Sequence, residues 1–106
     1  MANINKSLDV FVTFRYKTKT GEIDTTITSK GCAVPEMWAL NNTTRTTTTL
    51  VIHRESGKVV FACRGRANDL PKIAKEEKLG SCKEYGIPLD FLHSIKDKRF
   101  DKEDAI

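Results

Sequence analysis

A strict alternation of apolar and polar side chains near the amino terminus is the feature that most constrains the fold. Along residues 8–17 every second side chain is apolar, and Phe11 is the exception that falls on the polar side. A period of two in β-branched and aromatic residues is typical of a half-buried strand. Residues 22–28 repeat the alternation more weakly after a turn signal at 19–21. Together the two segments predict an antiparallel hairpin.

A second hairpin is predicted from residues 43–53 and 58–64, with the turn at 55–57. Six of the seven residues from 43 to 49 are threonine, whose branched side chain is stiff and favours the pleated strand. The sequence leaves open whether this Thr-rich strand is central or lies at an edge of the sheet. At an edge, it could pair with a strand of another protein.

Three helices complete the pattern. Residues 35–40 begin with Pro and Glu and are followed by two asparagines, which is typical of a short helix. A second helix is expected from Asn68 or Asp69 to Leu79, with Pro71 in its first turn and a glycine after its end. A third is expected over 88–95. The order β-β-α-β-β-α-α predicts an α+β domain: a small antiparallel sheet of about four strands in two hairpins, a short helix between them, and two C-terminal helices packed on one face.

The length of the chain fits one domain. We expect residues 1–106 to form a single unit, with 97–106 as a frayed, charged tail. No stretch approaches the ~18 consecutive apolar residues of a membrane span, and the first residues lack the apolar segment of a signal peptide. The sequence therefore predicts a cytoplasmic protein with no membrane partner.

Cysteine usage gives no sign of a disulfide framework or a metal site. Cys32, Cys63 and Cys82 are odd in number and widely spaced, which is typical of reduced thiols. The closely spaced Cys and His pairs of zinc sites are missing, so we expect no metal and no cofactor. Cys63 lies within an apolar alternation, where a thiol packs as a small hydrophobic group. Whether His53, His93 or any cysteine has a chemical role is left open.

Positive charge is concentrated in the middle of the chain. The formal net charge is +4, and residues 41–83 carry nine basic and four acidic side chains. Such a segment attracts polyanions, although an ordinary solvated surface is an equally good interpretation. On a helix, Lys72, Lys75 and Lys78 would form one stripe. The candidate binding residues are Arg45, Arg54, Lys58, Arg64, Arg66, Lys72, Lys75 and Lys78.

Catalytic signatures are missing from the sequence. Ser56 sits in a tight turn and not in a G-x-S-x-G elbow. No glycine-rich phosphate loop occurs, and the carboxylates fit helix surfaces and caps. We therefore expect no enzyme and no catalytic residue.

These observations predict a small non-enzymatic binding protein with a regulatory or accessory role. The expected partner is nucleic acid, held by its phosphate backbone through the basic 45–78 region, or a nucleic-acid-handling protein. The alternative is a protein-binding inhibitor or modulator, such as a phage or mobile-element accessory protein that blocks a host protein. The oligomeric state is left open.

Overall fold

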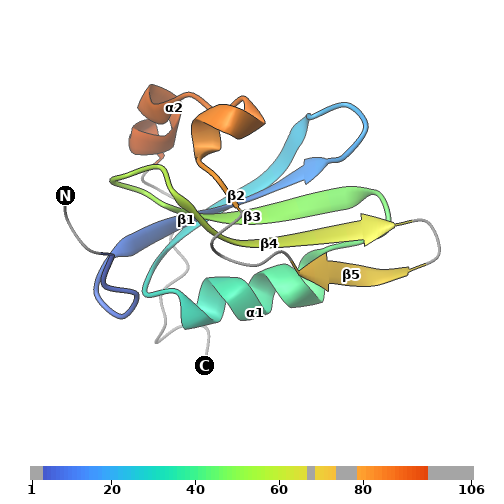
Figure 1. Ribbon diagram of the computed structural model, residues 1–106, viewed down its shortest axis with the longest axis horizontal. Helices are drawn as coiled ribbons and strands as arrows, with labels where there is room; N and C mark the ends of the chain where they lie inside the picture. Colours follow the sequence, from blue (N-terminus) through green and yellow to red (C-terminus); the bar gives the residue numbers. More distant parts are fainter. Residues whose placement is uncertain (1–3, 67–68, 74–78, 96–106) are drawn as a thin grey trace.

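The computed structural model is an α+β fold built on one five-stranded sheet. It describes residues 4–66, 69–73 and 79–95, without the side chains of 66 and 69–71. Neighbouring strands are all antiparallel, in the order β2-β1-β3-β4-β5 (Figure 1). The elements are β1 Val10–Lys17, β2 Ile23–Lys30, α1 Ala33–Asn42, β3 Thr47–His53, β4 Val59–Arg66, β5 Asp69–Ile73, the 3-10 helix η2 Cys82–Tyr85, and α2 Leu89–Ser94.

Both predicted hairpins are confirmed. β1 and β2 pair across a turn in which Gly21 has a φ of 76°, a conformation that glycine adopts without steric cost. β3 and β4 form the second hairpin, and β3 also pairs with β1. The predicted helices at 35–40 and 88–95 are present as α1 and α2, with α1 starting two residues earlier than predicted.

The Thr-rich strand is β3, and it is central. It is hydrogen-bonded to β1 on one side and to β4 on the other, and all seven of its residues are buried. Because both of its backbone edges are already paired, β3 cannot accept a strand from a partner. The two edge strands of the sheet are β2 and β5.

Residues 69–73 form a strand, so the prediction of a helix beginning at Asn68 or Asp69 is wrong there. β5 pairs with β4, placing Ile73 opposite Cys63 and Lys72 opposite Arg64. Two physical effects outweigh the helical spacing. Leu70 precedes Pro71, and the proline ring pushes the preceding residue into extended backbone. An edge strand also tolerates proline, since half of its backbone groups face away from the sheet. The rest of the predicted helix, 74–78, lies outside the described residues.

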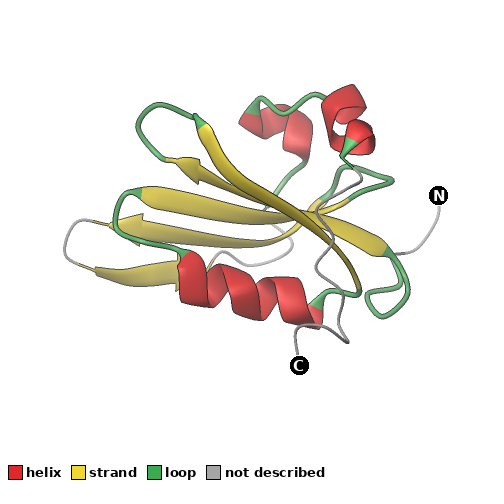
Figure 2. Ribbon diagram, turned by 180° about the vertical axis from the view of Figure 1, so that it is seen from behind, coloured by secondary structure: helices red, strands yellow, loops and turns green. Residues whose placement is uncertain are grey.

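Helices cover both faces of the sheet, not one face as the sequence predicted (Figures 1 and 2). α1 packs on one face, where Phe11, Val51 and Ala39 are buried together. η2 and α2 pack on the other, over Phe14, Leu50 and neighbouring residues. The run Leu50-Val51-Ile52 requires this arrangement, because consecutive strand residues point to opposite faces and all three are apolar. Phe11, the exception in the alternation, points to the opposite face from Val12 and therefore packs against α1.

Candidate nucleic-acid interface

The fold divides the predicted basic region between the two ends of the sheet. Arg54 and Lys58 flank the β3–β4 turn, which we call the hairpin tip. Arg64 and Lys72 lie at the opposite end, where β3 begins and β4 ends. Arg64 is paired with Thr48 of β3, which lies six residues before Arg54 in the sequence. Because a strand advances about 3.3 Å per residue, the two ends are about 20 Å apart. The predicted residues whose side chains the structure describes therefore do not form one continuous surface.

At the end away from the tip, one row of side chains crosses all five strands. Residues that are directly paired in antiparallel strands point to the same face. Here each residue is paired with one on the next strand, so the five side chains form a row on one face. We call this row, on the face covered elsewhere by η2 and α2, the Arg64 row. It consists of Ile23, Tyr16, Thr48, Arg64 and Lys72.

Two cations stand directly opposite each other in this row. Arg64 and Lys72 are exposed, and neither makes an ion pair or side-chain hydrogen bond within the described residues. Two other basic groups of the sheet are neutralised: Arg15 bonds Asp24 at 3.0 Å, and the Lys17 ammonium lies 3.4 Å from a Glu22 carboxylate oxygen. Like charges on directly opposed strand residues repel each other. The Arg64 row therefore presents positive charge that the described part of the chain does not neutralise.

A third cation, Arg45, is held near the same end by close backbone packing. A Cβ atom at Gly65 would overlap the carbonyl oxygen of Thr44 and lie 3.0 Å from the Cα of Arg45. Only glycine therefore lets the segment before β3 lie against β4, and this contact fixes the backbone of Arg45 against Gly65, on the α1 face of the sheet and opposite the face of Arg64. The Arg66 side chain lies outside the described part, as do Lys75 and Lys78.

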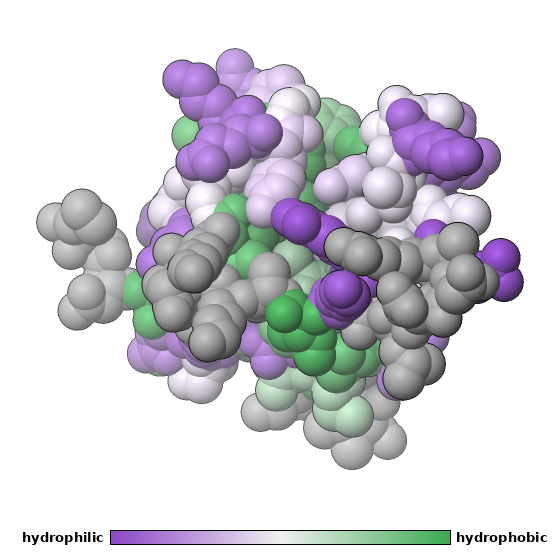
Figure 3. Space-filling model, turned by 45° about the vertical axis from the view of Figure 1, so that its right-hand side comes forward, coloured by the Kyte–Doolittle hydropathy of each residue, from purple (hydrophilic) through white to green (hydrophobic). Residues whose placement is uncertain are grey.

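Two tyrosines accompany these cations. Tyr16 and Tyr85 are half-buried and pack at the margin of the apolar cluster under η2 and α2. Burial raises the pKa of the Tyr16 phenol, an effect that Arg64 opposes and Tyr85 reinforces, so the three side chains lie within electrostatic range. Figure 3 brings this end of the sheet forward and shows hydrophilic side chains around an apolar strip. In the sequence, Tyr16 follows the alternation of the core residues, so its place in this row was not predicted.

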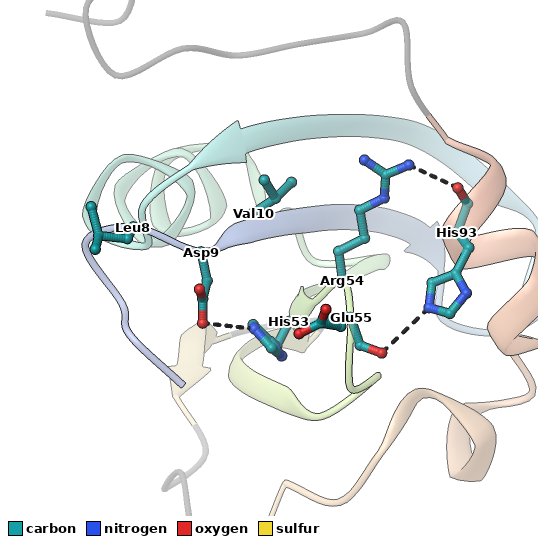
Figure 4. Close-up of a pocket in the computed structure, with 7 residues that line it drawn as sticks. All are labelled: Leu8, Asp9, Val10, His53, Arg54, Glu55 and His93. Atoms are coloured by element: carbon teal, nitrogen blue, oxygen red, sulfur yellow. Dashed lines mark hydrogen bonds and ion pairs between the residues drawn. The ribbon is translucent and has the colours of Figure 1, made fainter. Parts of the chain in front are cut away.

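The hairpin tip holds an open cavity of about 420 Å³ between the start of β1, the turn and α2 (Figure 4). Its walls combine apolar groups with several titratable ones, which makes it the second candidate site. The residues that line it are Leu8, Asp9, Val10, His53, Arg54, Glu55 and His93.

His53, on one wall of this cavity, links Asp9 to Ser56. Its Nε2 lies 2.9 Å from an Asp9 carboxylate oxygen, and its Nδ1 lies 2.7 Å from the Ser56 hydroxyl. A carboxylate only accepts hydrogen bonds, so Nε2 carries the proton, and Nδ1 accepts from Ser56. The order serine, histidine, aspartate is that of hydrolase triads, although the two ring nitrogens have exchanged partners.

The surroundings of Ser56 give this array a structural role. The Ser56 oxygen also accepts a hydrogen bond from the Lys58 amide, at 3.2 Å. The Gly57 amide, which would be the natural oxyanion donor, is bonded to the His53 carbonyl at 2.8 Å. An acyl-transfer site needs such donors free to hold the developing charge, and Ser56 does not line the cavity. The array therefore locks the turn to the segment before β1.

Arg54 also serves the fold. Its guanidinium donates to the His93 carbonyl at 2.8 Å, and the His93 ring contacts the Glu55 carbonyl at 3.4 Å (Figure 4). These contacts tie the end of α2 to the hairpin tip. Lys58, by contrast, is exposed, and its contacts within the described residues are all made by its backbone, with Ser56, His53 and Ser81.

The cysteines are buried, and within the described residues none is in a disulfide. Cys63 is a core residue of β4, as predicted, and burial raises the pKa of its thiol. Among the residues described, no group of three His, Cys, Asp or Glu side chains is placed to hold a metal ion, and no helix is long and apolar enough to cross a membrane.

Comparisons with known proteins returned no match: no family model, no curated protein and no solved structure resembles this chain. Its function must therefore be argued from the geometry of the two ends of the sheet.

Proposed function

We propose that the protein binds nucleic acid through phosphate contacts at the Arg64 row, without catalysis and in a regulatory or accessory role. The observation that carries this proposal is the opposition of Arg64 and Lys72 on neighbouring strands. Like charges in that position cost stability, on the order of 0.2–1 kcal/mol relative to a neutral pair. A phosphate backbone removes the repulsion, because it places anionic oxygens against both side chains.

The rest of this end supports the same partner. Arg45 adds an exposed cation at the same end of the sheet, on a backbone fixed against Gly65 on the α1 face. Contacts of this kind hold nucleic acid in place and carry no sequence information. One argument for the alternative, a protein-binding modulator, was that the Thr-rich strand could pair with a strand of the partner. This strand is central in the sheet, so it has no free edge for such pairing.

The salt dependence of binding tests the proposal. Labelled DNA is titrated with the wild type and with Arg64→Gln, and anisotropy is followed across a salt series. Each lost phosphate contact reduces the slope of log affinity against log salt by about 0.9 on duplex DNA or about 0.7 on a single strand. Arg64→Gln should lower both affinity and slope.

Lys58→Gln is the matched control. It removes the same formal charge from an exposed position at the hairpin tip, so it should leave the slope nearly unchanged. Equal effects of Arg64→Gln and Lys58→Gln would mean that net charge alone governs binding. The absence of binding to any DNA or RNA at low salt would reject the proposal and favour a protein partner.

A further inference from the structure

We infer that the Arg64 row takes single-stranded nucleic acid, with an unpaired base stacked on Tyr16 and the adjoining phosphates on Arg64 and Lys72. This inference rests on the proposed function and specifies the class of nucleic acid.

The row places an aromatic ring and two cations on one face of the sheet. Tyr16 and Arg64 flank Thr48 from opposite sides, and Lys72 lies beyond Arg64. Since neighbouring strands are about 4.8 Å apart, Tyr16 and Arg64 are about 10 Å apart at the backbone. Thr48, which is buried between them, has a short side chain whose hydroxyl lies 2.9 Å from that of Thr18 and also meets the Tyr16 phenol. A base on the ring therefore has its phosphate within reach of the arginine.

The cover over the sheet ends just before Tyr16. On the same face of β1, Val12 and Phe14 are fully buried beneath the η2 and α2 layer, whereas Tyr16 is only half-buried. The ribbon shows η2 and α2 over one half of the sheet, with the ends of β1 and β4 projecting beyond them (Figure 1). An aromatic ring at the rim of this cover can accept a stacked group without disturbing the core.

Tyr85 borders the same site from the helical layer. It is the last residue of η2, and its hydroxyl donates to the Leu79 carbonyl at 2.7 Å, which fixes the position of its ring. Tyr16 and Tyr85 thus belong to two different elements, one on each side of the boundary. An aromatic ring with cations beside it is the arrangement that binds unpaired bases, since every base offers a face for stacking.

A duplex cannot use this arrangement. Its bases are stacked on one another and present only their edges in the grooves. A duplex would therefore contact the cations and leave Tyr16 without a partner. For this reason the ring distinguishes a single strand from a duplex, whereas the cations alone do not.

The test compares a labelled oligothymidylate with a mixed-sequence duplex of the same length, at matched salt. We expect the single strand to bind more tightly. Tyr16→Leu should weaken single-strand binding by about tenfold with little change in salt slope, and Tyr16→Phe should retain it. Phe14→Leu is the matched control, because it removes an aromatic ring that is fully buried; its thermal unfolding and that of Tyr16→Leu verify that both remain folded.

Photocrosslinking of the wild type covers the case in which Tyr16→Leu does not fold. An oligonucleotide carrying 5-iodouracil should crosslink to Tyr16 or Tyr85, as mapped by mass spectrometry. Two results would overturn this inference without rejecting the phosphate contacts. One is that crosslinks are confined to the hairpin tip. The other is that the duplex binds as tightly as the single strand and Tyr16→Leu has no effect. Failure of both probes to bind at low salt would overturn the proposed function itself.

Discussion

The two ends of the sheet hold similar side chains in different surroundings. At the hairpin tip the polar groups are bonded to one another: Asp9 to His53, His53 to Ser56, and Arg54 to the end of α2. At the Arg64 row the cations have no partner within the described residues. The contrast indicates that a basic residue found in a sequence is a candidate for binding only where the fold gives its side chain no partner.

The largest expected effect is on the backbone packing at the Arg64 end. Gly65→Ala places a methyl group on the Thr44 carbonyl, which belongs to the backbone and cannot rotate away. We expect a loss of about 3 kcal/mol or more in the free energy of unfolding, measured by urea denaturation. Gly21→Ala is the control: its Cβ meets nothing within 4 Å, so only its positive φ costs energy, about 1–2 kcal/mol. Equal losses would disprove the close approach.

His53 should matter for stability and not for binding. Its ring is buried against Phe11, with a centroid separation of 5.5 Å, and joins Asp9 to the turn. His53→Ala should lower the free energy of unfolding by about 2–3 kcal/mol and leave DNA affinity unchanged. The exposed His93 provides the control, since His93→Ala should change stability by no more than about 0.5 kcal/mol. A loss of DNA affinity in His53→Ala, with the protein still folded, would place the tip in the binding site.

Arg54 and Arg64 form the sharpest pair, because each is an arginine of the same hairpin. Arg54→Gln should cost about 1 kcal/mol of stability, since it removes the charged donor to the His93 carbonyl, with affinity retained. Arg64→Gln should leave stability unchanged or raise it by a few tenths of a kcal/mol, because it relieves the repulsion from Lys72, and should weaken binding. A loss of affinity in Arg54→Gln together with a loss of stability in Arg64→Gln would contradict the roles given to the two ends.

The smallest effect concerns the opposite edge of the sheet. The hydrogen bond from Arg15 lowers the pKa of Asp24 below its ordinary value of 3.8. Because the folded-state pKa is the lower one, this stabilisation is complete above pH 3.8 and is lost as the pH falls through the lowered pKa. Asp24→Asn should therefore be slightly less stable than the wild type at neutral pH, and the two should converge in acid. If the difference in stability between Asp24→Asn and the wild type does not change with pH, this ion pair is not its cause.

Local patterns predicted much of this fold. Alternation in 8–17 and 58–64 identified the strands of both hairpins, and proline followed by asparagines identified α1. Predictions failed where long-range pairing decided the outcome. Residues 69–73 have helical spacing, yet they form a strand because the edge of β4 offers them hydrogen-bond partners. Likewise, no local signal shows that α1 and α2 lie on opposite faces, although Leu50-Val51-Ile52 requires apolar contacts on both.

The candidate site was only partly predictable for the same reason. Composition identified Arg64 and Lys72, but only the register of β4 and β5 shows that they are opposed. Arg54 has the same charge in the sequence, and its engagement with α2 depends on a contact 39 residues away. Tyr16 reads as a core residue until the extent of the helical cover is known.

Mapping the bound surface by NMR tests the central claim most directly. Amide shifts of the wild type are followed during titration with oligothymidylate at low salt. We expect the amide shifts around Tyr16, Thr48, Arg64 and Lys72 to change and those from His53 to Lys58 to stay constant, which would place the nucleic acid on the Arg64 row. Changes centred on the hairpin tip, with the Arg64 row unaffected, would contradict it.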